Sequence, residues 1–373
     1  MNEQRLFSLF EDLCRIDAPA LRERASVDFT KRYLTDMGLE VWEDDAGGRI
    51  GSDANNVFAK LPGTKPTAPK MFFCAHFDTV EPTAGLEIGL ESRVYVSKSD
   101  TILGADDKAG MAPAIEAVAS LQENGGDYGD VFLVLCVAEE IGLLGALECE
   151  EIRNLGVDYG YVFDTGPPVG TFVNRVGSRN DFDARIIGKP AHAGKHPEEG
   201  INAIQTAGAA LAKMRLGRID EVTTSNVGLI EGGSAVNVVP ANVLLRGEAR
   251  SFDSEKLQAQ LQNMESTVRD ACAESGATCE IQTRSAYRGY HIDAGHPVIA
   301  NAVAAAKSIG FSGALRDTLG GSDANAFNEK GITTIVCGTG MEKIHTHDEF
   351  VSQDDLVGLT KLAIELARIA AKQ

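Results

Sequence analysis

The chain has 373 residues, of which 43% are hydrophobic and 24% are charged, and it carries a formal net charge of −19. This is the composition of a globular protein, and at roughly 150 residues per domain the length suggests two domains. The acidic charge argues against binding to nucleic acids or to an anionic membrane surface, and no apolar run approaches the ~20 residues of a membrane span. The cysteines are odd in number and form no CxxC pair, which favours reduced thiols in a cytoplasmic protein.

The first 177 residues alternate between helical and strand patterns. Apolar residues at helical spacing predict two opening amphipathic helices, and the acidic N-terminal stretch does not resemble a signal peptide. Fully apolar runs predict strands buried on both faces, at residues 71–75, 131–137 and 159–163. Strands that alternate with helices are typical of a parallel sheet with helices on both faces, so we predict an α/β fold.

The pattern changes near residue 178 and changes back near residue 289. Between these points the segments follow the order β-α-β-β-α-β, which predicts an α+β, ferredoxin-like domain over 178–288. A fourth apolar strand, at 333–337, and a last amphipathic helix belong again to the first pattern. We therefore expect one domain made of residues 1–177 and 289–373, with the second domain inserted into it.

Side chains that bind metals follow the apolar strands. They are His76 and Asp78, Glu139 and Glu140, Asp164, and His345 and His347, and a glycine-bounded loop adds Asp106 and Asp107. In open parallel sheets, the carboxyl ends of the strands meet at one edge, where ligands bind. Each motif alone also fits a solvated strand end, but together the imidazoles and carboxylates suit zinc, manganese or cobalt. They outnumber the ligands of one catalytic zinc ion, which predicts two ions that share a bridging carboxylate.

Other catalytic signatures are missing from the sequence. It contains no HExxH zinc motif, no GxSxG nucleophile elbow and no GxGxxG turn after a first strand. Cys74 lies close to His76 but falls within an apolar run, so we expect it to belong to the core.

Several segments together resemble the M20 metallopeptidases, and within that group the peptidase T-like tripeptidases. They are HFDTV, GADDKAG, AEEIG, FDTG, AHAGKHPEEGINA, GGSAVNVVP, LGGSDAN and HTHDEFV. The resemblance covers nearly the whole chain. It implies a zinc-peptidase-like catalytic domain with an inserted lid domain through which a homodimer can form.

The resemblance also implies a division of the ligands between two metal ions. One ion would be held by His76, Asp106 and Asp164, and the other by Asp106, Glu140 and His345. The spacing of the family motifs selects His345 rather than His347, and Asp106 rather than Asp107. It further implies that the Asp106–Asp107 peptide bond is cis.

Two acidic residues would then have other roles. Glu139 is expected to be the general base, and Asp78 to orient the imidazole of His76. Glu139 and Glu140 point to opposite sides of a regular strand. Given a local turn, one of them can face the metal ions while the other faces the substrate.

Three residues of the inserted domain match positions that hold the substrate in the family. His192 would stabilise the developing oxyanion, and Asn237 and Arg250 would hold the backbone and carboxylate of the peptide. The alternatives are a histidine that satisfies a loop carbonyl, and an arginine in a surface ion pair. The turn at Gly320–Asp323 either contacts a peptide terminus or simply begins a helix.

From the sequence we expect a cytoplasmic dimetal aminopeptidase that removes the N-terminal residue from short peptides. An N-acyl-amino-acid deacylase of the same group is the first alternative. A peptide-binding protein without catalysis is the second, and the intact ligand set with Glu139 argues against it.

Overall fold

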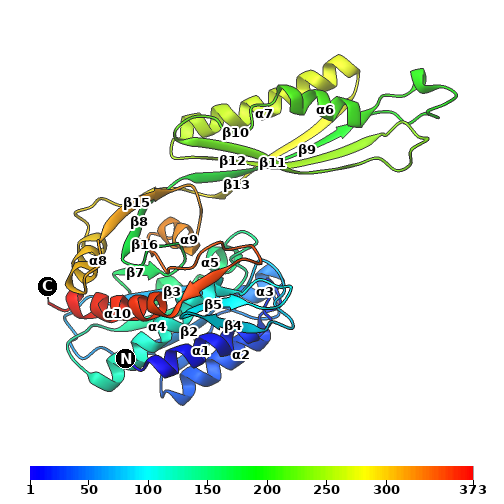
Figure 1. Cartoon of the computed structure of the whole chain (residues 1–373). Coiled ribbons are helices and arrows are strands. Elements are labelled where there is room, and N and C mark those ends of the chain that lie inside the picture. Colours follow the sequence, from blue (N-terminus) through cyan, green and yellow to red (C-terminus); the bar gives the residue numbers. More distant parts are fainter. Residues whose placement is uncertain (373) are drawn as a thin grey trace. The chain divides into compact units, whose positions relative to one another are not determined.

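The computed structural model describes residues 1–372 and divides into two compact units (Figure 1). The first unit comprises Met1–Arg175, His291–Asp317 and the chain from Ser322 onward. The second comprises Val176–Tyr290 and the short segment Thr318–Gly321. The roles of catalytic and lid domain stay predictions.

A nine-stranded sheet forms the centre of the first unit, with the strand order β1-β2-β6-β3-β7-β16-β8-β14 and with β15 paired to β8. The strands are β1 (Glu40–Glu43), β2 (Val57–Leu61), β3 (Met71–His76), β6 (Val131–Cys136), β7 (Tyr159–Val162), β8 (Thr171–Val176), β14 (Tyr290–His291), β15 (Ala314–Thr318) and β16 (Thr334–Cys337). The four central strands β6, β3, β7 and β16 run parallel, and antiparallel pairs extend the sheet on both sides. The predicted α/β class is confirmed.

Helices cover both faces of this sheet, which explains the unbroken apolar runs of its central strands. Helix α4 (Ala105–Asn124) packs on β3 and β6, and α1 (Glu3–Arg15) and α10 (Gln353–Ala370) pack on α4. Helix α9 (Asp323–Glu329) packs on β7 and β16. Adjacent residues of β3 show both faces: the ring of Phe72 meets Phe327 of α9, and the ring of Phe73 stacks on Phe163.

The remaining elements of this unit lie around the sheet. They are α2 (Arg24–Asp36), α3 (Ala46–Ile50), α5 (Leu144–Glu148), α8 (Pro297–Ser308) and a three-stranded sheet of β4 (Ile88–Glu91), β5 (Val94–Ser97) and β17 (Phe350–Ser352). The glycine-rich turn at 320–323 leads directly into α9. Ser322 caps that helix in a capping box with Asn325, so the turn begins a helix, which was one of its two predicted roles.

The second unit has the predicted β-α-β-β-α-β order with one additional two-residue strand, β10. Its elements are β9 (Ser178–Ile187), α6 (Ala203–Lys213), the short β10 (Gly217–Arg218), β11 (Thr223–Gly232), β12 (Asn242–Ser251), α7 (Ser254–Ser275) and β13 (Thr278–Tyr287). The antiparallel sheet has the order β10-β11-β12-β9-β13. Phe182, Ala184 and Ile186 of β9 point to one face, where α6 and α7 enclose a core with them. The intervening residues face away from this core, as expected for a sheet covered on one side.

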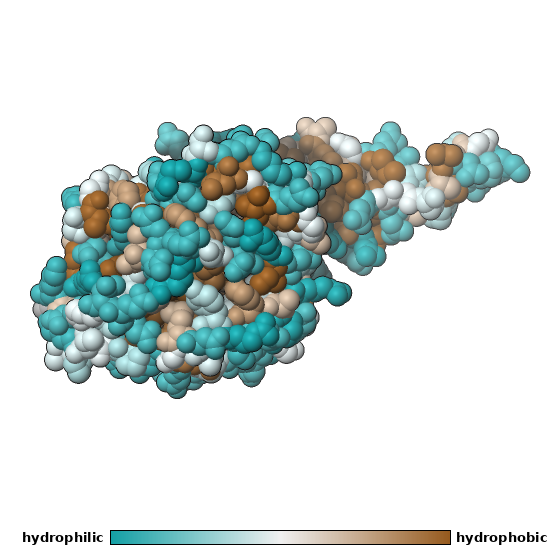
Figure 2. Space-filling view, turned by 60° about the horizontal axis from the view of Figure 1, so that its bottom comes forward, coloured by the Kyte–Doolittle hydropathy of each residue, from teal (hydrophilic) through white to brown (hydrophobic). Residues whose placement is uncertain are grey.

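The surface is predominantly hydrophilic on the face shown in Figure 2, with scattered apolar side chains. Among residues 1–372, no helix is both long enough and apolar enough to cross a membrane. All seven cysteines are free thiols, and Cys74 is fully buried in β3.

Candidate active site

One carboxylate lies between two imidazoles at the carboxyl edge of the central strands. Asp106 Oδ1 is 3.2 Å from Nε2 of His76, which ends β3. Asp106 Oδ2 is 3.2 Å from Nε2 of His345, in the loop before β17. The two oxygens of Asp106 thus face different histidines, the arrangement expected of a carboxylate that bridges two cations.

The other predicted ligands surround the same point. Glu140 Oε2 is 3.2 Å from Nε2 of His345. Asp164, after β7, and Glu139, after β6, each place a carboxylate oxygen 4.0 Å from Nε2 of His76. The structure therefore brings together every residue that the sequence assigns to the metal ions and to the base.

This geometry fits divalent cations. Two ligand atoms bound to the same tetrahedral zinc ion at about 2.0–2.1 Å lie about 3.3 Å from each other. The three imidazole–carboxylate separations of 3.2 Å in this site are close to that value. Ligand atoms of His76, Asp106 and Glu140 all lie within 4.8 Å of one another, as do those of His76, Asp107 and Asp164. The Oε1 atom of Glu140 is buried and has no hydrogen-bond partner among the described residues.

The pKa values of the buried carboxyl groups also favour a site that binds positive charge. Burial raises the pKa of Glu139 and of Asp164 well above the ordinary values, and the neighbouring carboxylates add to this effect. For Asp106, burial opposes ionisation, but hydrogen bonds with His345 and His76 lower its pKa below the ordinary value. The same bond to Asp106, together with Glu140, raises the pKa of His345 to about 10. Adjacent buried carboxylates are stable as anions only beside cations.

Asp78 connects two parts of the site. Its Oδ1 lies 3.4 Å from Nδ1 of His76, and its backbone carbonyl oxygen lies 3.0 Å from the same atom. Its two carboxylate oxygens also accept hydrogen bonds from the backbone N–H groups of Glu139, at 2.9 Å, and Glu140, at 3.0 Å. Asp78 is fully buried, so it can fix the imidazole and the segment with the two glutamates at once.

Two acidic residues beside this site have contacts that the sequence motifs do not indicate. Glu349 accepts hydrogen bonds from the backbone N–H groups of Gly104, at 2.7 Å, and Asp106, at 2.9 Å. Asp107 Oδ2 accepts from the backbone N–H of His76, and its Oδ1 is buried without a partner among the described residues. Glu349 lies within the HTHDEF motif, where it served only to count the spacing to His345. The Asp106–Asp107 peptide bond is cis, as the resemblance predicts.

Two of the three predicted substrate-binding residues lie on neighbouring loops of the second unit. The backbone N–H of Ala193, next to His192, donates to the carbonyl oxygen of Asn237 at 3.0 Å. The imidazole of His192 accepts from the backbone N–H of Gly194 at 3.1 Å and is exposed. Arg250 lies near the other end of β12, eight residues beyond Asn242, which corresponds to about 27 Å along a strand. This unit therefore does not bring Arg250 close to His192 and Asn237.

Arg250 also has local partners. Its guanidinium pairs with the carboxylate of Glu248 at 2.7 Å and donates to the backbone carbonyl oxygen of Leu319 at 3.0 Å. These contacts match the alternative of an ion pair, and the role in substrate binding stays a prediction.

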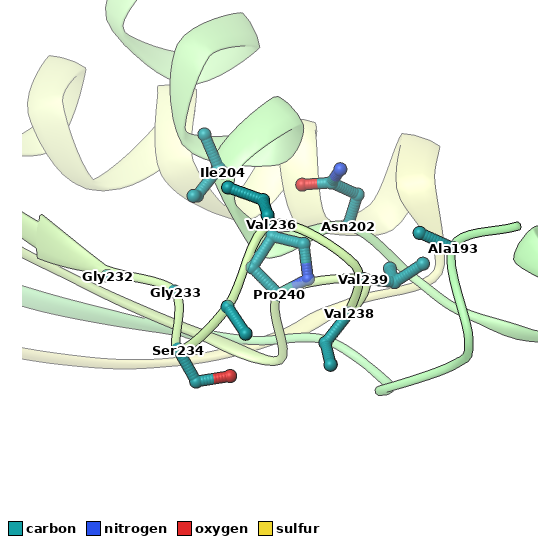
Figure 3. Close-up of a pocket in the computed structure, with 11 residues that line it drawn as sticks. Ala193, Asn202, Ile204, Gly232, Gly233, Ser234, Val236, Val238, Val239 and Pro240 are labelled. Carbon is teal, nitrogen blue, oxygen red and sulfur yellow. The ribbon is translucent and has the colours of Figure 1, made fainter.

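A pocket of about 570 Å³ lies entirely within the second unit (Figure 3). The residues that line it are Ala193, Asn202, Ile204, Gly232–Val236 and Val238–Pro240. The lining is mainly apolar and includes none of the candidate metal ligands, which belong to the first unit.

The α/β fold and the cluster of imidazoles and carboxylates at its strand ends are typical of a metal-dependent hydrolase. The model of peptidase family M20/M25/M40 matches residues 72–368. The chain belongs to this family of metallopeptidases, and the predicted resemblance is confirmed.

Relatives extend the similarity over the whole chain. The uncharacterized protein YqjE of Bacillus subtilis is 38% identical over 372 residues, which cover 100% of both chains. The crystal structure of a tripeptidase from Staphylococcus aureus has a TM-score of 0.93 and 35% identity, with 100% of both chains covered. The structure of aminopeptidase PepT from Bacillus cereus has a TM-score of 0.88 and 36% identity, and covers 100% of this chain and 99% of that one.

Proposed function

We propose that this protein is a dimetal aminopeptidase that removes the N-terminal residue from short peptides, tripeptides among them. The observation that carries the proposal is the position of Asp106, whose two oxygens face His76 and His345. The similarity of the whole chain to the structures of a tripeptidase and of an aminopeptidase supports the choice of substrate.

The ligands in this proposal are those expected from the sequence. His76, Asp106 and Asp164 would hold one ion, and Asp106, Glu140 and His345 the other. Two bound divalent ions, zinc or else manganese or cobalt, would lower the pKa of a shared water molecule and polarise the scissile carbonyl group.

The chain supplies proton transfer through Glu139. A carboxylate oxygen of Glu139 takes a proton from the attacking water and delivers it to the nitrogen of the leaving amine. Its Oε2 lies 4.0 Å from Nε2 of His76. Asp78 holds His76 and Glu139 in position relative to each other, because its carboxylate contacts the imidazole of His76 and accepts from the backbone N–H of Glu139.

Substrate binding by His192, Asn237 and Arg250 remains part of the proposal. His192 has an exposed imidazole whose Nε2 is not engaged by the contact with Gly194, and this supports a role towards substrate. His192→Ala should lower kcat by roughly 10²-fold and leave metal content unchanged. An unchanged kcat per folded, metal-loaded molecule would return His192 to a structural role.

We also propose a cytoplasmic homodimer formed through the inserted unit. The exposed apolar side chains of Ile204, Leu229, Ile230 and Val236 in that unit support it, because burying apolar surface in an interface is favourable. Sedimentation equilibrium measures the mass directly, and a monomer at micromolar concentration would remove this part of the proposal.

A peptide panel tests the reaction. Metal-loaded protein should hydrolyse tripeptides with a free amino terminus, with release of the first residue, and should act more slowly on dipeptides and tetrapeptides. The same peptides with an acetylated amino terminus should not react. N-acylated amino acids complete the panel. Faster cleavage of these than of the free peptides would favour the deacylase. No hydrolysis of the peptides or of the acylated amino acids would favour a binding protein.

A further inference from the structure

The segment that carries Glu139 and Glu140 leaves its strand through an unusual residue. Strand β6 ends at Cys136, and Ala138 has a φ of 54°, in the left-handed region. A residue with a Cβ adopts this region only at a cost in free energy. The turn interrupts the alternation of a regular strand, so both glutamates can face the candidate site. Some interaction must therefore hold Ala138 in place.

Three consecutive backbone N–H groups in this segment donate to two carboxylates from distant parts of the chain. Those of Glu139 and Glu140 donate to Asp78, as described above. That of Ala138 donates to Oε1 of Glu23 at 2.9 Å, across 115 residues of sequence. Asp78 thus holds one side of the turn, and Glu23 holds the left-handed residue itself.

The side chain of Glu23 makes this contact and neither reaches solvent nor caps its own helix. It is completely buried. It precedes α2 at the N-cap position, but its side chain makes no capping hydrogen bond. Oε1 also accepts from the backbone N–H of Leu21 at 2.9 Å, and Oε2 accepts from the hydroxyl of Ser52 at 2.9 Å. Burying a carboxylate is costly unless such bonds compensate, and a helix cap does not explain the cost here.

We propose that Glu23 is a positioning residue that holds the left-handed turn at Ala138, and through it the directions of Glu139 and Glu140. Glu23 acts through backbone groups and touches neither the candidate ligands nor the reacting atoms. The inference rests on the proposed function, because it assumes that the two glutamates act in hydrolysis. The contact itself can be measured without activity.

Two conservative variants separate the geometry of Glu23 from its charge. Glu23→Gln keeps an acceptor oxygen at the position of Oε1, and its amide nitrogen can donate to the hydroxyl of Ser52. Glu23→Asp keeps the charge but shortens the side chain by one methylene group, which withdraws the acceptor from Ala138. Glu23→Gln should keep kcat within about 3-fold of the original protein, whereas Glu23→Asp should lower kcat by roughly 10–10²-fold with little change in KM.

A second measurement does not depend on metal or substrate. Hydrogen exchange of the Ala138 amide, followed by NMR in the metal-free protein, should be slow in the original protein and in Glu23→Gln. It should be faster in Glu23→Asp and Glu23→Ala. Glu116→Ala is the matched control, because Glu116 is equally buried but bonds to Arg5 and Ser120. This variant should lose stability and keep the exchange rate at Ala138.

The outcomes are distinct. Equal kcat and equal Ala138 exchange in Glu23→Asp and the original protein would overturn the inference, as would a Glu23→Gln variant as impaired as Glu23→Asp. If Glu23→Ala does not fold, the Gln and Asp variants still decide the question. Glu139→Gln is measured in parallel. Full activity in that variant would refute the proposed base, whereas the exchange data would still report on Glu23.

Discussion

A single methyl group at Gly110 should disable the candidate site. Gly110 lies in the first turns of α4, four residues after Asp106. A Cβ at this position would lie 2.5 Å from Oδ1 of Asp107 and closer still to the carbonyl oxygen of Phe163, whereas real Cβ atoms essentially never approach closer than 3.0 Å. Gly110→Ala therefore forces these groups apart by at least 0.5 Å, the difference between 3.0 and 2.5 Å, and by more at Phe163.

The groups that must move belong to residues next to candidate ligands in the chain. Asp107 follows Asp106, and Phe163 precedes Asp164. A misplacement of about 1 Å costs roughly 10²-fold in rate, which corresponds to about 2.7 kcal/mol of transition-state stabilisation. We expect kcat/KM for a tripeptide to fall by about this factor, and metal content to fall below that of the original protein. Hydrolysis, elemental analysis and circular dichroism measure activity, metal and folding on the same preparation.

The control is Gly208→Ala in α6. Gly208 is also helical, but a Cβ there would have no heavy atom within 4 Å. This change should raise the free energy of unfolding by about 0.5–1 kcal/mol through helix propensity and leave hydrolysis unchanged. A folded Gly110→Ala variant with normal kcat/KM and normal metal content would refute the reasoning, because the space beside Gly110 would then have no bearing on the site.

Further predictions concern the glutamates and the metals. Glu139→Gln should keep bound metal and lose about 10²–10⁴-fold in kcat, whereas Glu140→Gln should lose part of its metal. Elemental analysis combined with kinetics distinguishes the two variants. Normal turnover in Glu139→Gln would contradict the proposed base. Removal of metal with a chelator should abolish hydrolysis, and titration should restore it near two ions per chain and with weaker affinity at acid pH; a plateau at one ion contradicts a dimetal site. Glu43 supplies a pH dependence: burial opposes its ionisation, but hydrogen bonds from Arg24 and Lys31 lower its pKa to about 2. This pKa lies below the ~4.3 of an unfolded chain, so the ionised group stabilises the fold above pH ~4, and this contribution is lost as the pH falls towards 2. Glu43→Gln should lower the free energy of unfolding by about 1–2 kcal/mol at pH 7 and by less near pH 2, as urea titrations would show; an equal loss at both pH values contradicts this explanation.

The sequence predicts the central sheet well because burial on both faces leaves an unbroken apolar signal. The sheet of β4, β5 and β17 was missed for the opposite reason. The strands of the hairpin Ile88–Ser97 are short and partly exposed, and its turn uses Ser92 and Arg93. Both residues have positive φ values, of 49° and 69°, without the asparagine or glycine that marks such a turn in a sequence.

The candidate ligands were predictable because they follow buried strands, and parallel strands end at one edge. The residues that position them were not. Glu23 is a lone glutamate before a helix, and its contact with Ala138 spans a large part of the first unit's sequence. The separation of Arg250 from Asn237 follows from the length of β12 and not from the family motifs.

The acidic residues of this site differ in whether their oxygens accept backbone N–H groups. Oxygens of Asp106 and Glu140 lie beside imidazole nitrogens, and these residues are the proposed metal ligands. Oxygens of Asp78, Glu23 and Glu349 accept backbone N–H groups of the segments around Ala138–Glu140 and Gly104–Asp106. Bonds of the second kind involve only the protein, so they can fix the loops before any cation binds. A site fixed in this way does not have to order its loops on metal binding, and the free energy of binding is then available to hold the cations and the reacting groups.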